Sequence, residues 1–319
     1  MQITGKEPGI NFMLVSVIIP TYNRNKILCR TIENIIKYKH QYTELIIIDQ
    51  TKEHEPETKI YLDNLINNNI IKYIYVDYPN LPNARNIGIN TSLGNIIIFF
   101  DDDVEINENT IPSHISSLSY SNVGCVTGKV TIFNINKNDN IVLRSSNRYK
   151  KILKSILFFF LRKKASYVGR IGILSDFSGD KLLPSDTCIG CNMSFKKEAL
   201  IKCGLFDSNY KGNAIREDTD MSVRIKKNKY KILYNPDASI IHFMDNSGGT
   251  RTALNEIYWS AIFKNQCYFY LKNFRFSYFY IFLLHIYDFI RCRKSNFKFI
   301  PIFNKCFKEA TYLKEKLNG

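Results

Sequence analysis

The sequence predicts an α/β protein with a mostly parallel central sheet and helices on both faces. Two observations support this fold. In the first half of the chain, continuous apolar, β-branched runs alternate with runs of helical spacing, and each apolar run ends in polar or acidic residues. Strands that are apolar throughout are typical of parallel sheets buried on both faces. The 319 residues are enough to form a core of this size.

The expected elements alternate regularly from the first strand onward. The run LVSVIIP at 14–20 predicts a buried strand that ends in a turn, and the next segment has apolar residues at helical spacing. Strands are expected at 14–20, 44–49, 71–76 and 95–100, and helices at 26–38, around 59–67 and at 84–91.

Polar residues stand where these strands end. Thr21 and Tyr22 follow the first strand, Asp49 ends the second, and three consecutive Asp residues at 101–103 follow the fourth. Ligands of open α/β sheets bind beyond the carboxyl ends of the strands. We therefore expect these side chains to border one crevice.

The three carboxylates at 101–103 indicate a cation site. Carboxylates this close together repel one another unless a cation lies among them, and hard oxygen ligands suit Mg²⁺ or Mn²⁺. In an extended stretch, Asp101 and Asp103 would face one side and Asp102 the other. The alternative is the acidic N-terminus of a helix opening at 106–110.

The formal net charge of +15 is concentrated in two segments. Residues 141–172 carry nine basic and no acidic side chains, and residues 250–319 carry 12 basic and four acidic ones. Both segments are also rich in aromatic and aliphatic residues, as in KKILKSILFFFLRKK at 150–164. This combination favours a helix lying on an anionic membrane surface, and no nucleic-acid-binding motif is present. Solvated lysines on ordinary helices are the alternative.

Other features exclude several classes of protein. The longest uncharged apolar stretch near the C-terminus has 12 residues, whereas a bilayer span needs about 18. The first residues lack the basic and apolar regions of a signal peptide. The eight scattered cysteines are typical of reduced thiols, and CIGC at 188–191 lacks the second pair of a zinc site. We expect a cytoplasmic protein, peripheral at the inner face of the cell membrane.

Eight motifs occur in a fixed order along the chain. They are SVIIPTYNR, Asp49 at its strand end, LPNARNIGI, IIIFFDDDV, IGCNMSFKKEAL, CGLFD, IREDTDMSVRI and YKILYNPDASIIH. Together they resemble family 2 glycosyltransferases, which have the GT-A fold, an inverting mechanism and a DxD motif. The resemblance implies a Rossmann-like, mostly parallel sheet that binds a nucleotide-diphosphate sugar.

The resemblance also implies which residues bind the donor. Tyr22 would lie against the base, and Asp49 would accept hydrogen bonds from it. Because relatives carry a second acidic residue where this chain has Gln50, the base stays open: UDP is favoured, and GDP or dTDP is possible. The Arg85 side chain would be oriented near the nucleotide pocket. The alternative role for Arg85 is a salt bridge at the start of a helix. The donor-binding residues implied are Pro20, Thr21, Tyr22, Asp49, Arg85, Asp101, Asp102, Asn192 and Arg251.

Metal ligands follow from the same resemblance. Asp101 and Asp103 match the DxD motif, which binds the divalent cation, Mg²⁺ or Mn²⁺, on the donor diphosphate. His242 matches the residue that completes the coordination of this metal, with a structural histidine as the alternative. A metal in this position offsets the charge that develops on the leaving nucleoside diphosphate.

The stretch REDTD at 216–220 matches the motif that carries the general base. The resemblance assigns this role to Asp218, supported by Glu217, and Asp220 is expected to cap the helix that follows. One carboxylate that deprotonates the acceptor hydroxyl suffices for inversion when a metal holds the leaving group. Simple capping of the helix N-terminus is the alternative for this acidic group.

Two loops of the acceptor half complete the implied site. Gly190 and Asn192 match a tight loop that lets the backbone approach the donor sugar. The sequence SGGTR at 247–251 has glycines that allow it to close over the diphosphate, where Arg251 would clamp it. An ordinary linker is the alternative for this second loop.

The resulting hypothesis is an inverting, metal-dependent glycosyltransferase of cell-surface polysaccharide synthesis, acting on a saccharide or polyprenyl-linked acceptor. The expected domains are a GT-A domain at 1–250 and a basic, aromatic helical tail at 251–319. Within the first, the nucleotide-binding half spans about 14–132, a basic insertion 141–172, and the acceptor half about 173–250. A nucleotidyltransferase is one alternative, although no Gly-rich loop follows the first strand. A non-catalytic saccharide- or nucleic-acid-binding protein is the other.

Overall fold

The computed structural model describes most of the two halves expected from the sequence and part of the tail. The described residues are 13–134, 139–142, 179–243, 248–249, 256–275, 277–278, 281–282 and 299–317. Arg251 and nearly all of the basic insertion lie outside the described residues, so the expectations for them stay predictions.

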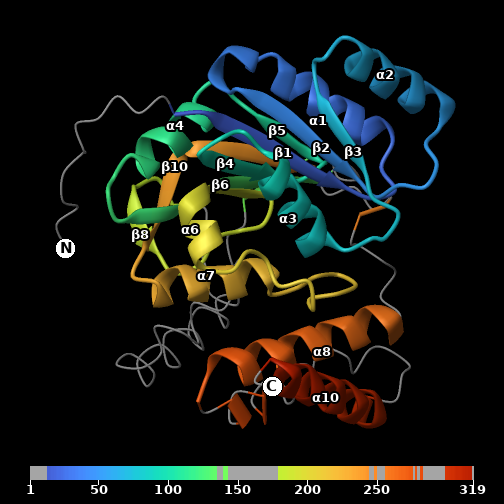
Figure 1. Cartoon of the computed structure of the whole chain (residues 1–319), viewed down its shortest axis with the longest axis vertical. Coiled ribbons are helices and arrows are strands. Elements are labelled where there is room, and N and C mark those ends of the chain that lie inside the picture. The colour runs from blue at the N-terminus through green and yellow to red at the C-terminus, as the bar shows by residue number, and fades with distance from the viewer. Residues whose placement is uncertain are drawn as a thin grey trace.

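The four strands expected in the first half are present and parallel to one another (Figure 1). They are β1 (Val15–Thr21), β2 (Glu44–Asp49), β3 (Lys72–Tyr75) and β4 (Ile96–Phe100). The connecting helices are α1 (Lys26–Ile36), α2 (Pro56–Asn67) and α3 (Leu81–Thr91), with a short 3₁₀ helix, η1 (Lys39–Gln41), after α1. Helices α2 and α3 begin earlier than expected because each has a proline in its first turn, where proline is well tolerated.

The second half extends the same sheet with strands of both directions. Its strands are β5 (Val104–Ile106), β6 (Val123–Asn134), β7 (Asp139–Val142), β8 (Leu183–Ser185), β9 (Asn192–Lys196) and β10 (Lys231–Phe243). The strand order is β3-β2-β1-β4-β9-β6-β10-β5, with β7 beside β6 and β8 beside β10. β9 lies antiparallel between β4 and β6, so the parallel arrangement is confined to the first half and the β6–β10 pair.

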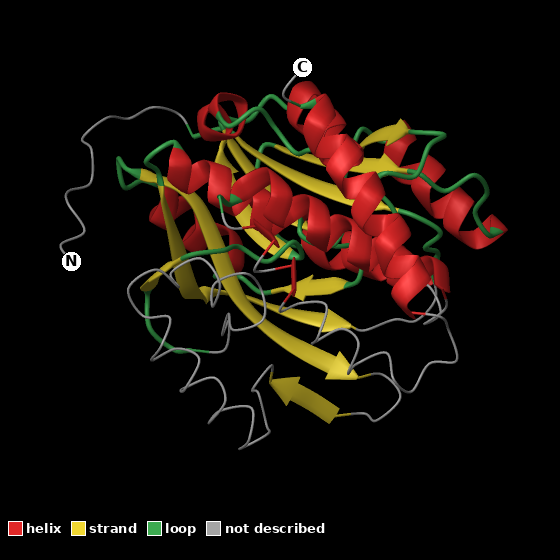
Figure 2. Ribbon diagram, turned by 90° about the horizontal axis from the view of Figure 1, so that it is seen from below, coloured by secondary structure: helices red, strands yellow, loops and turns green. Residues whose placement is uncertain are grey.

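The register between β6 and β10 shifts in the middle of the pair. Asn235 pairs with Gly128 and Ile240 with Val130, so four residues of β10 lie opposite the single residue Lys129 of β6. Extra residues of this kind form a β-bulge, which bends a strand and increases its twist. Figure 2 shows the strong twist of the sheet.

Both faces of the sheet are buried under helices. The cluster on one face joins alternate strand residues such as Val17 and Ile19 to α1, α2 and α4 (Thr110–Leu118). The cluster on the other face joins Ile18 and its neighbours to α3, α6 (Lys197–Lys202) and α7 (Glu217–Lys227). This alternation explains why the central strands are apolar throughout.

A third layer of helices packs against α7 (Figure 1). It consists of α8 (Glu256–Asn273) and α10 (Phe299–Lys316), and so the expected helical extension is present. Most aromatic side chains of α8, such as Trp259, Phe263 and Phe269, are at most 4% exposed and pack inside the protein, and Tyr258 is half-buried. Within the part of the chain that the structure describes, no helix is both long and apolar enough to cross a membrane.

Candidate active site

The residues that follow the strands meet at one edge of the sheet. Thr21 at the end of β1 pairs with Asp49 at the end of β2, and the acidic residues 101–103 lie directly after β4. They lead into β5 rather than into a helix, so the alternative of an acidic helix N-terminus is wrong. The end of β10 reaches the same place, because β10 runs in the same direction as β4 and its His242 pairs with Val104 in the antiparallel β5–β10 ladder.

Three potential metal ligands are brought together there. Ligand atoms of Asp101, Asp103 and His242 all lie within 4.8 Å of one another, and His242 Nε2 is 2.8 Å from Asp103 Oδ1. Asp102 points elsewhere: its Oδ2 accepts a hydrogen bond of 2.7 Å from the Thr21 hydroxyl. Carboxylate oxygens with one imidazole nitrogen fit a divalent cation such as Mg²⁺ or Mn²⁺. The separation of Asp102 from its neighbours agrees with the expected alternation, although residues 102–103 form a turn.

Arg24 is a site residue to which the sequence analysis gave no role. Its side chain is 3% exposed, with Nε 3.3 Å from Asp102 Oδ1 and Nη2 3.3 Å from Asp103 Oδ2. Burial and the neighbouring Asp103 raise the pKa of Asp102 to about 7, and Arg24 opposes this rise. Gly249 covers Arg24 and donates its backbone N–H to the Tyr22 carbonyl at 2.8 Å. The PTYNR motif is the sequence signal that contains Arg24.

A cavity of about 220 Å³ opens beside this group. Pro20, Thr21 and Tyr22 line it together with Arg24, as does the acidic turn. The far wall comes from segments that the sequence did not connect with the donor, namely Asn80, Gly212, Asn213, Ile257, Tyr258 and Ala261. The last three belong to α8, so the expected tail contributes to this cavity.

Asp49 lies behind the cavity wall instead of lining it. It is fully buried, and its Oδ2 is 2.6 Å from His54 Nε2 and accepts a hydrogen bond of 3.1 Å from the Tyr73 hydroxyl. The polar side chain that reaches the cavity is Gln50, whose Oε1 accepts the Asn80 backbone N–H at 2.5 Å. The expected contact between Asp49 and the base stays a prediction, and the side chain of this strand end that lines the cavity is that of Gln50.

A second cavity, of about 320 Å³, adjoins the first. The two share Leu81, Asp101 and Asn213, and the second is also lined by Asp218 and His242. The metal-ligand group therefore lies at the junction of the two cavities. This arrangement offers room for two substrates, one on each side of a metal ion.

The carboxylates of the second cavity differ in their surroundings. Asp218 Oδ2 accepts the Gly190 backbone N–H at 3.0 Å, and Oδ1 accepts the Thr219 backbone N–H at 2.6 Å. Glu217 is buried in an ion pair with Arg85, and burial raises its pKa to about 7 although Arg85 lowers it. Arg85 Nη2 also donates to the Gly190 carbonyl at 3.2 Å. Of the two carboxylates at the start of α7, Asp218 is thus the half-exposed one in the cavity, while Glu217 and Arg85 form the wall behind it.

Asn192 lies outside both cavities. Its Nδ2 donates to the Ala238 carbonyl at 2.8 Å and to the Lys129 carbonyl at 3.2 Å. Its Oδ1 lies 2.8 Å from Nε2 of the buried His114. The side chain thus links β9 to β6 and β10, and the residues of this loop that reach the second cavity are Ile189, Gly190 and Cys191.

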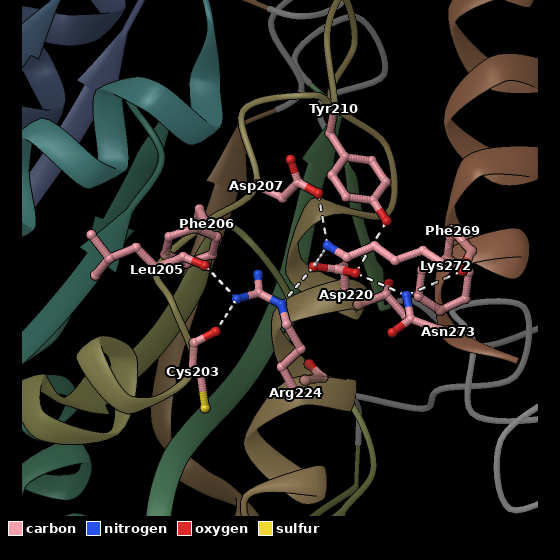
Figure 3. Close-up of polar contacts among 12 residues, drawn as sticks. Cys203, Leu205, Phe206, Asp207, Tyr210, Asp220, Arg224, Phe269, Lys272 and Asn273 are labelled. Carbon is pink, nitrogen blue, oxygen red and sulfur yellow. Dashed lines mark hydrogen bonds and ion pairs between the residues drawn. The ribbon is translucent and has the colours of Figure 1, made fainter. Parts of the chain in front are cut away.

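Asp220 does not cap α7. Helix α7 begins after Arg216, which has a left-handed φ of 79°, and no side chain caps it. The Asp220 carboxylate is fully buried and bonds to Tyr210, Arg224, Lys272 and Asn273 (Figure 3). Its partners include two residues of α8, so it connects α7 to the C-terminal layer.

The sheet order and the acidic turn after β4 show that the protein has the GT-A fold of glycosyltransferases. A solved structure with this fold is similar over most of the chain: GalNAc-T7, solved with UDP, GalNAc and Mn²⁺, has a TM-score of 0.54 at 18% identity, covering 83% of this chain and 51% of that one. The predicted fold class is confirmed.

Residues 16–204 match the family model for glycosyl transferase family 2, and the chain belongs to this family. The poly-beta-1,6-N-acetyl-D-glucosamine synthase of Staphylococcus aureus is 23% identical over 72% of this chain and 51% of its own length. The UDP-Glc:alpha-D-GlcNAc-diphosphoundecaprenol beta-1,3-glucosyltransferase WfgD of Escherichia coli is 26% identical over 44% of this chain and 56% of its own. The chain thus spans about half the length of these relatives.

The buried His114 gives the fold a defined pH dependence. Burial lowers the pKa of this histidine to about 4, whereas in the unfolded chain the histidine pKa is about 6.5. The imidazole therefore takes up its second proton less readily in the folded protein than in the unfolded chain. Its contribution to stability is full above about pH 6.5 and decreases by up to about 3 kcal/mol as the pH falls towards 4. Urea unfolding of the wild type and of His114→Gln between these pH values measures the difference. Equal pH dependence in the two proteins would contradict a neutral, buried histidine.

Proposed function

We propose that the protein transfers a sugar, with inversion, from a nucleotide-diphosphate sugar to a saccharide or lipid-linked saccharide acceptor. The observation that carries this proposal is the pair of adjoining cavities with the metal-ligand group between them. The cavity beside Tyr22 would hold the nucleotide, and the cavity beside Asp218 would hold the acceptor. The anomeric carbon would lie near Asp101, where the two cavities meet.

Each residue of the site has a separate task in this reaction. A divalent cation bound by Asp101, Asp103 and His242 would offset the charge on the leaving diphosphate. Asp218 removes the proton of the acceptor hydroxyl as this hydroxyl attacks, on the face opposite the leaving group. The backbone N–H groups of Gly190 and Thr219 fix the orientation of this carboxylate.

The Glu217–Arg85 pair supports Asp218 from behind. Arg85 is fully buried and lies 3.8 Å from Asp101 as well as beside Glu217. It therefore links a carboxylate of the metal group to the helix that carries the base. A rigid link of this kind keeps the leaving group and the base at a fixed separation, which favours in-line displacement.

The donor is proposed to be a UDP-sugar, with Mg²⁺ or Mn²⁺ as the cation. UDP and Mn²⁺ are named with the similar structure of GalNAc-T7, and UDP-Glc with the similar Escherichia coli enzyme. In this chain the base would meet Tyr22 and Gln50, which line the first cavity. Asp49 does not line this cavity, and its oxygens contact Thr51, His54 and Tyr73.

The acceptor is proposed to belong to cell-surface polysaccharide synthesis. One relative is named for a diphosphoundecaprenol-linked acceptor and another for a polysaccharide, so a lipid-linked or growing saccharide is the acceptor class inferred. Such an acceptor requires access to the inner face of the cell membrane. The outer side of α10 offers exposed apolar residues, Ile300 and Tyr312, beside exposed lysines at 305, 308 and 316.

The general base is tested with Asp218→Asn. The donor used is the UDP-sugar that most stabilises the protein against heat. We expect the rate at which UDP is released from this donor to fall about 10²- to 10⁴-fold, because an amide cannot accept the proton. Affinity for UDP with Mn²⁺, measured by calorimetry, should stay within about twofold. Asp63→Asn, which changes an exposed carboxylate on α2, is the matched control. Wild-type turnover in Asp218→Asn would disprove the assignment.

The metal group is tested with Asp103→Ala. Removing this carboxylate takes away a metal ligand, so the tightening of UDP binding by Mn²⁺ should drop by about tenfold or more. Calorimetry with and without Mn²⁺ measures this effect, with Asp63→Ala as the control. If Mn²⁺ strengthens UDP binding equally in the wild type and in Asp103→Ala, the group does not hold the metal.

Membrane contact through α10 is tested with a triple variant in which Lys305, Lys308 and Lys316 are replaced by Ser. Each lysine near an anionic surface contributes about 1 kcal/mol, so partitioning onto phosphatidylglycerol vesicles should fall by about 100-fold. The control replaces Lys37, Lys52 and Lys59, which are exposed residues in the part of the chain from α1 to α2. Equal flotation of the two triple variants would leave α10 without a role at the membrane.

A further inference from the structure

Helix α8 contacts the segment that runs from Asp207 to Asp220 and carries the proposed base, Asp218. We propose that Lys272 of α8 is a positioning residue, which bridges the two ends of this segment and thereby fixes its conformation between the two cavities. The inference rests on the proposed function for its kinetic consequence. Its structural basis is independent of the reaction.

Lys272 joins two carboxylates that are far apart in the sequence (Figure 3). Its Nζ lies 2.7 Å from Asp207 Oδ2 and 3.0 Å from Asp220 Oδ2. The side chain of Asp207 is 12% exposed and that of Asp220 is fully buried, so both ion pairs are shielded from water. One ammonium group therefore closes the segment into a loop.

The remaining partners of the two carboxylates show that the network is balanced. Asp220 also accepts hydrogen bonds from Tyr210, Arg224 and Asn273, at 3.2, 2.8 and 2.8 Å. The two positive charges of Arg224 and Lys272 thus match the two negative charges of Asp207 and Asp220. Without Lys272 one buried negative charge would be left uncompensated, which is strongly unfavourable.

The backbone of the enclosed segment is strained. Gly212, Ala214 and Arg216 have left-handed φ values of 70°, 51° and 79°, and two of these residues have a Cβ atom. Residues in this conformation persist only where their surroundings hold them. Asn213, which lies among them, lines both cavities. A relaxation of the strain would therefore change the shape of the junction between the cavities.

Helix α8 holds the same segment at two further points. Asn265 is fully buried, and its Nδ2 donates to the Lys211 carbonyl at 2.9 Å. Gly212 packs directly on the helix, because a Cβ at this position would lie 2.9 Å from the Cβ of Ala261. These contacts orient the middle of the segment. Lys272 connects its two ends to each other by ion pairs, and the hydrogen bond from Tyr210 to Asp220 is a second, uncharged connection.

The metal group does not share this dependence on α8. Asp101 and Asp103 are held by β4 and β5, and His242 by β10, all within the central sheet. The segment lines the nucleotide cavity with Gly212 and Asn213, whereas all of residues 213–218 line the second cavity. Loss of Lys272 should therefore disturb the acceptor side and Asp218 more than it disturbs the binding of a nucleotide with its metal. This asymmetry separates a positioning residue from one that stabilises the whole protein.

The experiment compares Lys272→Met and Lys272→Arg with the wild type in the full chain. Lys264→Met is the matched control, because Lys264 is on the same helix but outside the network. Hydrogen–deuterium exchange is measured for peptides from 207–218 and from the central strands. The affinity for UDP with Mn²⁺ is measured by calorimetry, and kcat and KM are measured with the best donor.

We expect Lys272→Met to increase exchange at least about tenfold within 207–218 and to leave the central strands unchanged. The kcat should fall about 10- to 100-fold, while affinity for UDP with Mn²⁺ changes less than about threefold. Lys272→Arg keeps the positive charge, so it should show nearly wild-type protection from hydrogen exchange within 207–218 and most of the wild-type kcat. Lys264→Met should match the wild type.

Three results would overturn the proposal. They are unchanged exchange and kcat in Lys272→Met, exchange that rises equally throughout the protein, and a Lys272→Arg variant as defective as Lys272→Met. If the wild type transfers no sugar from any donor, the proposed function fails. The exchange and UDP-binding measurements then still decide whether Lys272 fixes the segment.

Discussion

Mutual repulsion among the carboxylates after β4 is the constraint on which the rest of the site depends. Asp102 and Asp103 are almost fully buried, so each needs a positively charged partner or a hydrogen-bond donor. Arg24 from the β1–α1 turn, Thr21 from the end of β1, and His242 from β10 supply these partners. The strands that meet at this edge of the sheet are thereby fixed relative to one another, and both cavities open where they meet.

The parts of the site that depend on local sequence were predictable, and those that depend on side-chain direction were not. The apolar strands and the acidic residues after β4 are visible in the sequence, and the order of motifs pointed to His242. The choice between Asp49 and Gln50 is different, because neighbouring side chains at a strand end point in opposite directions. Which of them reaches the cavity depends on the contacts of His54 and Tyr73, which no local pattern reveals.

The C-terminal helices illustrate a second limit of sequence reasoning. Aromatic residues interspersed with lysines have the same composition whether the aromatic rings face lipid or a protein core. In α8 the rings of Phe263 and Tyr268 are fully buried, and Lys272 ends in an ion-pair network instead of solvent. The charge imbalance at 250–319 therefore includes at least one lysine whose charge is neutralised inside the protein.

The bulge in β10 restricts how the gene for this protein can change in length. Side chains of a strand alternate between its two faces, and the four residues 236–239 opposite Lys129 set which face receives His242. Deleting or inserting a single codon in this stretch would turn His242 away from Asp103 and bring a neighbouring apolar side chain to the metal group. The position of His242 thus constrains the number of residues in the stretch 236–239, whichever side chains they carry.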